Sequence, residues 1–184
     1  MKHILLYLFA FTVLLNACTS PSEKNSSKAP ADLITTIQSF SDTVKMDTFK
    51  VVLQGENPKD MLLIFSITNF DGKEIYKKDL KARDLIDNYK ETLDLSKEKS
   101  QRDFIRDEFN LFFDEENFLW PALTSEQTPD KYAPDKAFFQ ELQQSDLNGF
   151  KYRLSKETNV YIAWSEKEKK VKVYYKCCWS AHEN

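Results

Sequence analysis

Regular alternation of apolar and polar side chains near both ends of the globular part of the chain constrains its fold most. In residues 48–54 and again in residues 171–179, the side chain at every second position is apolar. This period of two is typical of a β-strand with one buried face. The run at residues 61–68 is almost continuously apolar, which favours a central strand buried on both faces. Further strands are predicted at residues 74–76, 150–154 and 160–164.

Three amphipathic helices are predicted between the two groups of strands. The first has an apolar stripe that begins at Ala82, and Asp79 is expected to cap it. The second begins near Ser100 with a sequence like a capping box and continues into a phenylalanine-rich stripe. The third begins at Pro134 and ends before Gly149.

This order of elements indicates an α+β fold. The connections are short: Asn-Phe-Asp-Gly at residues 69–72 predicts a turn with Gly72 at positive φ, and the charged residues 165–170 predict a hairpin. We expect an antiparallel sheet of about five to six strands, covered on one face by about three helices. Residues 31–184 would form this single domain, which is large enough to fold without a metal or disulfide scaffold.

Residues 1–17 have the features of a signal peptide. Lys2 precedes an apolar run at residues 4–15, which is shorter than the roughly 20 residues needed to cross a membrane. The run leads into Leu-Asn-Ala-Cys, which ends at Cys18. This sequence resembles the lipobox of bacterial lipoproteins, and the resemblance implies cleavage after Ala17 and lipid attachment to the Cys18 thiol. The alternative is an ordinary secretory signal in which Cys18 is incidental.

Residues 18–30 are polar and have no periodicity, which predicts a flexible tether between the lipid-bearing Cys18 and the domain. In the lipoprotein class, an Asp directly after the lipidated Cys tends to retain the protein in the inner membrane. Thr19 occupies that position, so the resemblance implies an outer-membrane anchor in a bacterial cell envelope. The membrane partner would be contacted through acyl chains on Cys18, with the domain on the periplasmic or the outer side.

Composition excludes several function classes. The formal net charge of -3 offers no basic surface, so no nucleic-acid partner is expected. Gly55, Gly72 and Gly149 are the only glycines and lie too far apart for a phosphate-binding loop, so no cofactor is expected. His182 is the only histidine beyond the leader and lies close to the C-terminus. No catalytic residue and no metal site is therefore predicted.

Cys177 and Cys178 are adjacent in the last predicted strand. Neighbouring Cα atoms lie about 3.8 Å apart, below the usual 4.4–6.8 Å range for a disulfide, and a strand directs the two thiols to opposite faces. We therefore expect one core cysteine and one surface thiol. A strained vicinal disulfide and an intermolecular bond are the alternatives.

Acidic residues cluster around the second predicted helix. They are Asp103, Asp107, Glu108, Asp114, Glu115 and Glu116. Such clusters usually form a solvated helix face, which is the expected role here. Loose Ca2+ binding and glycoside hydrolysis are alternatives, and the latter requires two facing carboxylates about 5–9.5 Å apart.

Nine aromatic residues fall between Phe104 and Phe139, and most are expected to pack between the helices and the sheet. The alternative is an apolar groove around Phe118 and Trp120, where Pro121 interrupts regular structure and would leave Trp120 exposed. Tyr132 lies in a long loop predicted at residues 124–134, and loops often carry function. Phe118, Trp120 and Tyr132 are therefore the candidate binding residues.

The last strand also carries a strip formed by Lys172, Tyr174 and Lys176. We expect this strip to be an exposed sheet face, and the alternative is a strip that binds phosphate or sugar.

These observations predict a lipid-anchored module that is not an enzyme and that binds a protein partner or ligand in the cell envelope. Two alternatives are a carboxylate-dependent hydrolase of envelope glycans and an inhibitor or immunity-type protein. The inhibitor would present the loop at residues 124–134 as a protrusion.

Overall fold

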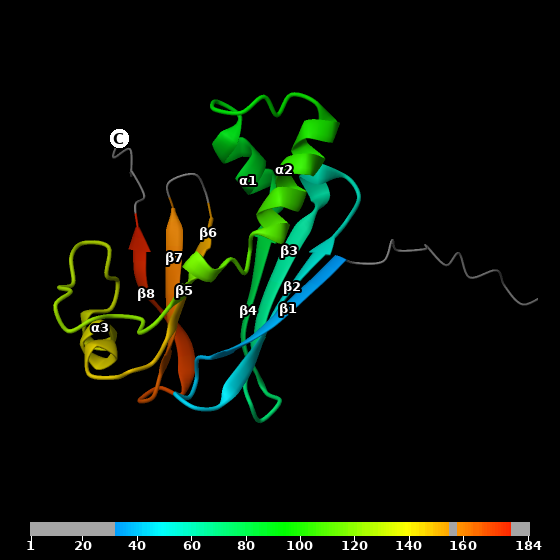
Figure 1. Ribbon diagram of the computed structural model, residues 1–184. Helices are drawn as coiled ribbons and strands as arrows, with labels where there is room; N and C mark the ends of the chain where they lie inside the picture. Colours follow the sequence, from blue (N-terminus) through cyan, green and yellow to red (C-terminus); the bar gives the residue numbers. More distant parts are fainter. Residues whose placement is uncertain (1–31, 155–157, 178–184) are drawn as a thin grey trace, which may run out of the picture.

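The computed structural model describes residues 32–154 and 158–177, which form an α+β fold (Figure 1). Within these residues, eight strands form two antiparallel sheets with the orders β1-β2-β3-β4 and β5-β6-β7-β8. Three α-helices accompany them. The predicted fold class is therefore confirmed, whereas the structure has two four-stranded sheets where one sheet of five or six strands was expected.

The first sheet is a meander in which each strand pairs with the next along the chain. It consists of β1 (Asp32–Ser39), β2 (Met46–Gln54), β3 (Leu62–Thr68) and β4 (Glu74–Lys81). One face of β3 is buried, but on the other face only Ser66 is buried, so the expectation of a strand buried on both faces is wrong. The predicted turn before β4 is confirmed, with Gly72 at φ +81°.

The helices are found where they are predicted but have different ends. They are α1 (Ala82–Tyr89), α2 (Glu98–Asn110) and α3 (Lys136–Gln143), and two 3-10 turns, η1 (Pro58–Asp60) and η2 (Glu115–Asn117), flank them. Asp79 belongs to β4, and the N-cap of α1 is Lys81, whose side chain makes no capping bond. α3 begins after Pro134 because the Asp135 carboxylate caps it, accepting a hydrogen bond from the Phe138 N–H at 3.0 Å. Gly149 begins a strand and does not end this helix.

The second sheet follows the helices in the sequence. It consists of β5 (Phe118–Leu119), β6 (Gly149–Arg153), β7 (Asn159–Ser165) and β8 (Lys170–Cys177). The predicted hairpin between β7 and β8 is confirmed. The pairing changes from Tyr161↔Tyr175 to Ile162↔Val173, so Tyr174 is an extra residue that shifts the register.

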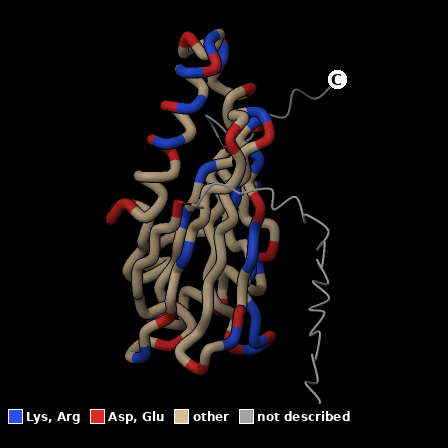
Figure 2. The backbone as a smooth tube through the Cα atoms, turned by 90° about the vertical axis from the view of Figure 1, so that its right-hand side faces the viewer, with Lys and Arg blue, Asp and Glu red and all other residues tan. Residues whose placement is uncertain are grey.

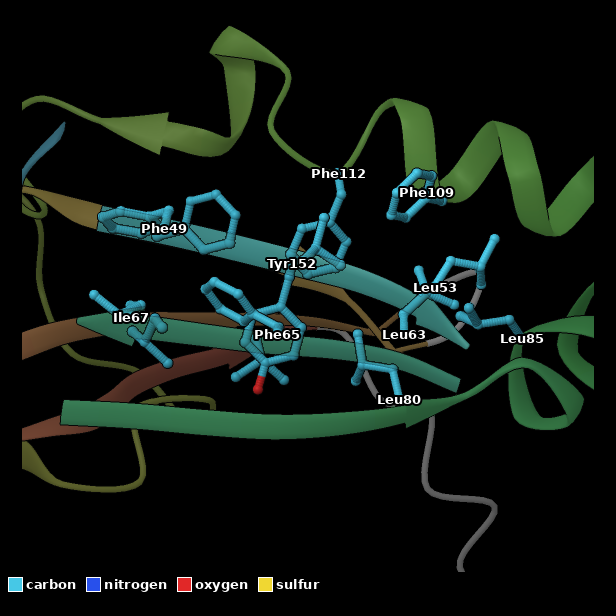
Figure 3. Close-up of a cluster of buried hydrophobic side chains, with 14 of the residues drawn as sticks. Phe49, Leu53, Leu63, Phe65, Ile67, Leu80, Leu85, Phe109, Phe112 and Tyr152 are labelled. Atoms are coloured by element: carbon cyan, nitrogen blue, oxygen red, sulfur yellow. The ribbon is translucent and has the colours of Figure 1, made fainter. Parts of the chain in front are cut away.

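The second sheet has a hydrophobic cluster on each face. On one face, Phe118, Phe150 and Tyr152 pack against the first sheet. They also pack with Phe109 of α2 and with Phe112, which directly follows α2. Figure 3 shows Phe112 and Phe109 directed from the helical segment toward the strands that carry Phe49, Phe65 and Tyr152. On the other face, α3 covers β7 and β8 and forms a smaller cluster. We call these the main cluster and the second cluster; the second comprises Ala122, Leu123, Ala133, Phe138, Phe139, Leu142, Ala163 and Tyr174.

The predicted strip is not an exposed face, because α3 covers the side of β8 that carries Lys172 and Tyr174. Val171 and Val173 pack partly against the main cluster, whereas Tyr175 packs against the second cluster, so the extra residue brings Tyr175 to the α3 side as well. Tyr174 is buried beneath α3, and the Lys172 ammonium lies 2.7 Å from the Asp135 carboxylate at the start of α3. The expected exposure of Lys172 and Tyr174 is therefore wrong, and only Lys176 is exposed.

Charged residues of both signs gather mainly at the two ends of the molecule (Figure 2). No helix among the described residues is long and apolar enough to cross a membrane. Cys18, Cys178 and His182 lie outside the described residues. Cys177 is disulfide-bonded, so the expectation of one core cysteine and one surface thiol, without a bridge, is wrong.

Candidate functional site

Phe118 and Trp120 lie on the same side of the short strand β5 and its continuation. Phe118 is buried in the main cluster, where its ring centroid lies 4.9 Å from that of Phe150. Trp120 stacks on Phe118 with ring centroids 6.2 Å apart and planes 9° from parallel. Trp120 remains 51% exposed. The structure therefore brings two of the three candidate residues together and leaves Trp120 accessible.

Leu119 and Pro121 face the opposite side of this segment and line a pocket of about 420 Å3. The pocket lies over the second cluster, between the second sheet and the loop that precedes α3. Its other lining residues are Ala122, Leu123, Thr124, Gln127, Thr128, Phe139, Tyr161, Tyr174 and Tyr175. We call it the tyrosine pocket. None of these lining side chains carries a charge, and the volume is within the range of about 300–1,000 Å3 found for small-molecule sites.

Three tyrosines from β7 and β8 form the floor of the tyrosine pocket. The Tyr161 ring makes an angle of 67° with Tyr174 and 85° with Tyr175, with centroids 6.0 and 5.5 Å apart. Tyr174 donates a hydrogen bond to the Ala122 carbonyl at 3.0 Å, and Tyr175 donates one to the Asp130 carboxylate at 2.9 Å. These bonds fix two of the rings, and among the described residues the Tyr161 hydroxyl has no such partner.

The phenols of the pocket stay neutral at physiological pH. Burial raises the pKa of Tyr161, and burial together with the nearby Tyr161 raises that of Tyr174. Burial and the hydrogen bond to Asp130 raise the pKa of Tyr175 to about 12. The site can therefore offer aromatic surface and hydrogen bonds, but its own lining supplies neither a charge nor a general base.

Tyr132, the third candidate residue, lies beside the tyrosine pocket and away from Trp120's partner Phe118. Its ring meets Tyr175 edge to face at a centroid distance of 6.0 Å, and the Lys131 ammonium lies 5.0 Å from its centroid. Its carbonyl accepts a hydrogen bond from the Lys176 N–H of β8 at 3.0 Å. Phe118, Trp120 and Tyr132 therefore do not form one groove.

The predicted loop at residues 124–134 is confirmed as irregular structure, and it closes one side of the tyrosine pocket. Gln143 of α3 donates a hydrogen bond to the Gln127 carbonyl at 2.5 Å, and Gln127 accepts one from the Thr124 N–H at 2.8 Å. Ala133 is buried in the second cluster. These contacts hold the loop against α3 and β8.

All members of the acidic cluster except Glu108 are exposed, as expected for a solvated face. Glu108 is half-buried, and with the exposed Asp114 and Glu116 it lines a second pocket of about 160 Å3, together with Tyr152 and Arg153. This acidic pocket lies beside the main cluster and has no lining residue in common with the tyrosine pocket.

Glu108 is the only half-buried carboxylate among the described residues that line the acidic pocket, and it forms an ion pair. Its side chain is 20% exposed and lies 3.6 Å from the Arg153 guanidinium. Burial raises the pKa of Glu108, while Arg153 opposes the shift and Asp107 adds to it. Among the described residues, no three His, Cys, Asp or Glu side chains are grouped so that they could hold a metal ion.

Comparison of the chain with protein-family models, with curated proteins and with solved structures gives no match. The site must therefore be interpreted from its own geometry.

The aromatic residues that line the pocket were not among the three candidate binding residues, although Tyr174 belongs to the strip for which phosphate or sugar binding was the alternative. Phe139 was assigned to the core, Tyr174 to an exposed face, and Tyr161 to a strand without a role. The period-two pattern of β7 did contain a signal, since Tyr161 lies on the face opposite the buried Val160 and Ile162.

Proposed function

We propose that this chain is a lipid-anchored lipoprotein of a bacterial cell envelope, and that its domain is a binding module and not an enzyme. The lipobox-like sequence that ends at Cys18 supports the anchor, and Thr19 supports an outer-membrane location. The tyrosine pocket is the observation that supports binding, and Trp120, on the opposite side of the β5 segment, adds a second exposed aromatic surface. The anchor would confine the domain near the membrane and raise its effective concentration for neighbouring molecules.

The lining of the tyrosine pocket favours a neutral ligand. A charged ligand would lose hydration there without gaining an opposite charge from any lining residue. Thr124, Gln127 and Thr128 are exposed at the mouth and supply hydroxyl and amide groups, while Tyr161 supplies a hydroxyl on the floor. A ligand with an apolar face and hydroxyl or amide groups, such as a neutral sugar or an uncharged peptide segment, fits this chemistry.

A photo-crosslinking amino acid placed in the intact lipoprotein tests the binding site in native membranes. We expect one defined product when the probe replaces Thr128 at the mouth of the pocket, and Trp120, on the opposite side of the β5 segment, is probed as a separate exposed surface. Mass spectrometry of the product identifies the ligand or partner. A probe at Leu93 is the matched control, because Leu93 is apolar and 44% exposed but lines neither the tyrosine pocket nor the acidic pocket.

The binding proposal also requires that the product depend on the pocket. Tyr161→Ala should abolish the product at Thr128 without changing the far-ultraviolet circular dichroism of the domain. Equal background labelling at Thr128, Trp120 and Leu93 would contradict the proposal.

The anchor is tested separately by Cys18→Ser. We expect this substitution to abolish labelling with radioactive palmitate and to release the protein from the membrane fraction. Persistent labelling would exclude Cys18 as the lipid-bearing residue, without bearing on the tyrosine pocket.

A carboxylate-dependent hydrolase of envelope glycans is the second candidate, and the position of Glu108 favours it. A carboxyl group whose pKa is raised by burial can act as a general acid, and Asp114 and Glu116 line the same pocket. Digestion of purified envelope glycans by the intact chain tests this candidate. Activity that is lost in Glu108→Gln but kept in Asp107→Asn, a change to the exposed neighbouring carboxylate, would favour the hydrolase over the binding module.

A further inference from the structure

The free edge of the first sheet lacks the features that usually protect a sheet edge. β1 pairs with β2 on one side and is the outermost strand of its sheet (Figure 1). Its eight residues contain no proline and no lysine, and its pairing with β2 is continuous without a bulge. Its one charged residue, Asp32, is at the very start of the strand and is paired with Arg106 at 2.8 Å. Among the residues that the structure describes, no strand pairs with the outer side of β1, so the middle of β1 offers backbone N–H and C=O groups for pairing.

Apolar side chains are exposed beside this edge. Leu33 and Ile37 of β1 are 57% and 59% exposed, and Met46, at the start of β2, is 48% exposed. With Val44 in the connection between the strands, they make up four of the eight large apolar side chains that are exposed among the described residues. Apolar surface concentrated in this way typically marks an interface.

The exposed face of β1 is symmetric about Thr35. Leu33, Thr35 and Ile37 point to the same side, so an apolar residue lies two positions before and two positions after a central threonine. In an antiparallel pair of two identical strands centred on this threonine, each Leu33 lies opposite the Ile37 of the other copy. Asp32 lies opposite Gln38, so no like charges meet across the pair.

We propose that β1 pairs antiparallel with β1 of a second copy of this chain, about a two-fold axis that passes through Thr35. The axis is perpendicular to the sheet, so the two four-stranded sheets join into one sheet of twice that size, and the exposed apolar residues of both copies lie on the same face. A two-fold interface requires the same surface on both partners, and the symmetric pattern of β1 meets this requirement. This inference is independent of the tyrosine pocket and of the lipid anchor.

A disulfide across the axis tests the pairing in the intact chain. Thr35→Cys places its thiol opposite the same thiol of the second copy, and we expect mild oxidation to give a covalent dimer. Lys50→Cys is the matched control, because Lys50 is exposed on the same face and pairs with Thr35 one strand further from the edge. Its thiols would be about 14 Å apart in the proposed dimer, three strand spacings, and should not join. The unchanged chain shows the background from the native cysteines.

The register is tested by mixing two variants, Leu33→Cys and Ile37→Cys, that carry different tags. We expect the mixture to form mainly mixed disulfide dimers, whereas each variant alone should form few. Ile37→Lys should convert the dimer to a monomer in light scattering while leaving the circular dichroism spectrum unchanged. A dimer yield for Thr35→Cys no greater than for Lys50→Cys would overturn the proposal, and so would self-joining of Ile37→Cys that matches the mixture.

Discussion

The two faces of the second sheet differ in the kind of aromatic residue that covers them. The face toward the first sheet packs in a phenylalanine-rich cluster, where Phe150 contacts Phe65 of the first sheet, and it forms a closed core. The face toward α3 carries three tyrosines of which Tyr161 and Tyr175 are only partly buried, and it retains the tyrosine pocket. A phenyl ring has no polar atom to satisfy and suits a dry core, whereas a phenol is suited to a surface with one wet side. We infer that one face mainly stabilises the domain and that the other is available for binding.

The largest expected effect is on the stability of the closed face. Phe65→Ala removes a fully buried ring that contacts six other aromatic rings, at Phe49, Tyr76, Phe112, Phe113, Phe150 and Tyr152. We expect the free energy of unfolding to fall by about 5 kcal/mol, at the upper end of the range for such substitutions. Urea denaturation of the variant measures this loss.

Phe139→Ala is the matched substitution on the other face. Phe139 is also buried, but it borders the tyrosine pocket, so the space that it leaves is open to solvent and does not become a closed cavity. We expect a smaller loss of about 3 kcal/mol. An equal or greater loss for Phe139→Ala would contradict the difference that we infer between the two faces.

Gly149, at the start of β6, is next in expected effect. A Cβ atom there would lie 3.0 Å from the Ala122 Cβ and 3.0 Å from the Tyr174 hydroxyl oxygen. Gly149→Ala must therefore displace the residues beneath the tyrosine pocket, and we expect a loss of about 1–3 kcal/mol in the free energy of unfolding. Combining it with Tyr174→Phe removes one of the two close contacts, so the two losses should be less than additive. Strict additivity would show that the hydroxyl is not the group that is displaced.

The fold class and most elements could be predicted from local patterns. The alternation in β2 and the stripe that begins at Ala82 depend on nearest neighbours, and both are confirmed. β1 was not predicted, because its adjacent Leu33 and Ile34 and its paired threonines do not alternate. The division of the strands into two sheets depends on pairing between distant segments, which local periodicity does not contain.

The site could be predicted only in part, for a related reason. The exposure of Trp120 was considered only as the alternative to core packing, from the interruption of regular structure at Pro121. The tyrosine pocket could not be predicted, because the packing of α3 over this side of β8 is a long-range contact and the extra residue at Tyr174 brings Tyr175 to the same side. A bulge of this kind is fixed by packing, and the alternation of β8 before and after it looks uninterrupted in the sequence.

Alkaline pH is expected to have a smaller effect, on the stability of the face that carries the tyrosine pocket. Tyr175 has its pKa raised to about 12 in the folded domain, against about 10 in an unfolded chain. Between these values the unfolded chain binds fewer protons than the folded domain, so stability is complete below pH 10 and falls as the pH rises toward 12. Thermal unfolding followed from pH 9 to pH 12 measures this fall. Tyr175→Phe should reduce it, and a variant whose stability falls as steeply as that of the unchanged chain would contradict the assignment.

The smallest expected effect on stability is also the one that separates binding from folding most clearly. Tyr161→Phe keeps the aromatic ring of the tyrosine pocket and removes a hydroxyl that has no hydrogen-bond partner among the described residues. We expect the free energy of unfolding to change by less than about 0.5 kcal/mol, because no protein hydrogen bond is lost. Crosslinking through Thr128 should nevertheless weaken if the hydroxyl contacts the ligand. Tyr174→Phe is the opposite case, since its hydroxyl bonds the Ala122 carbonyl and its loss should cost about 1–2 kcal/mol. If Tyr161→Phe proved the more destabilising of the two, the Tyr161 hydroxyl would stabilise the fold. It would then not be available to bind a ligand in the tyrosine pocket.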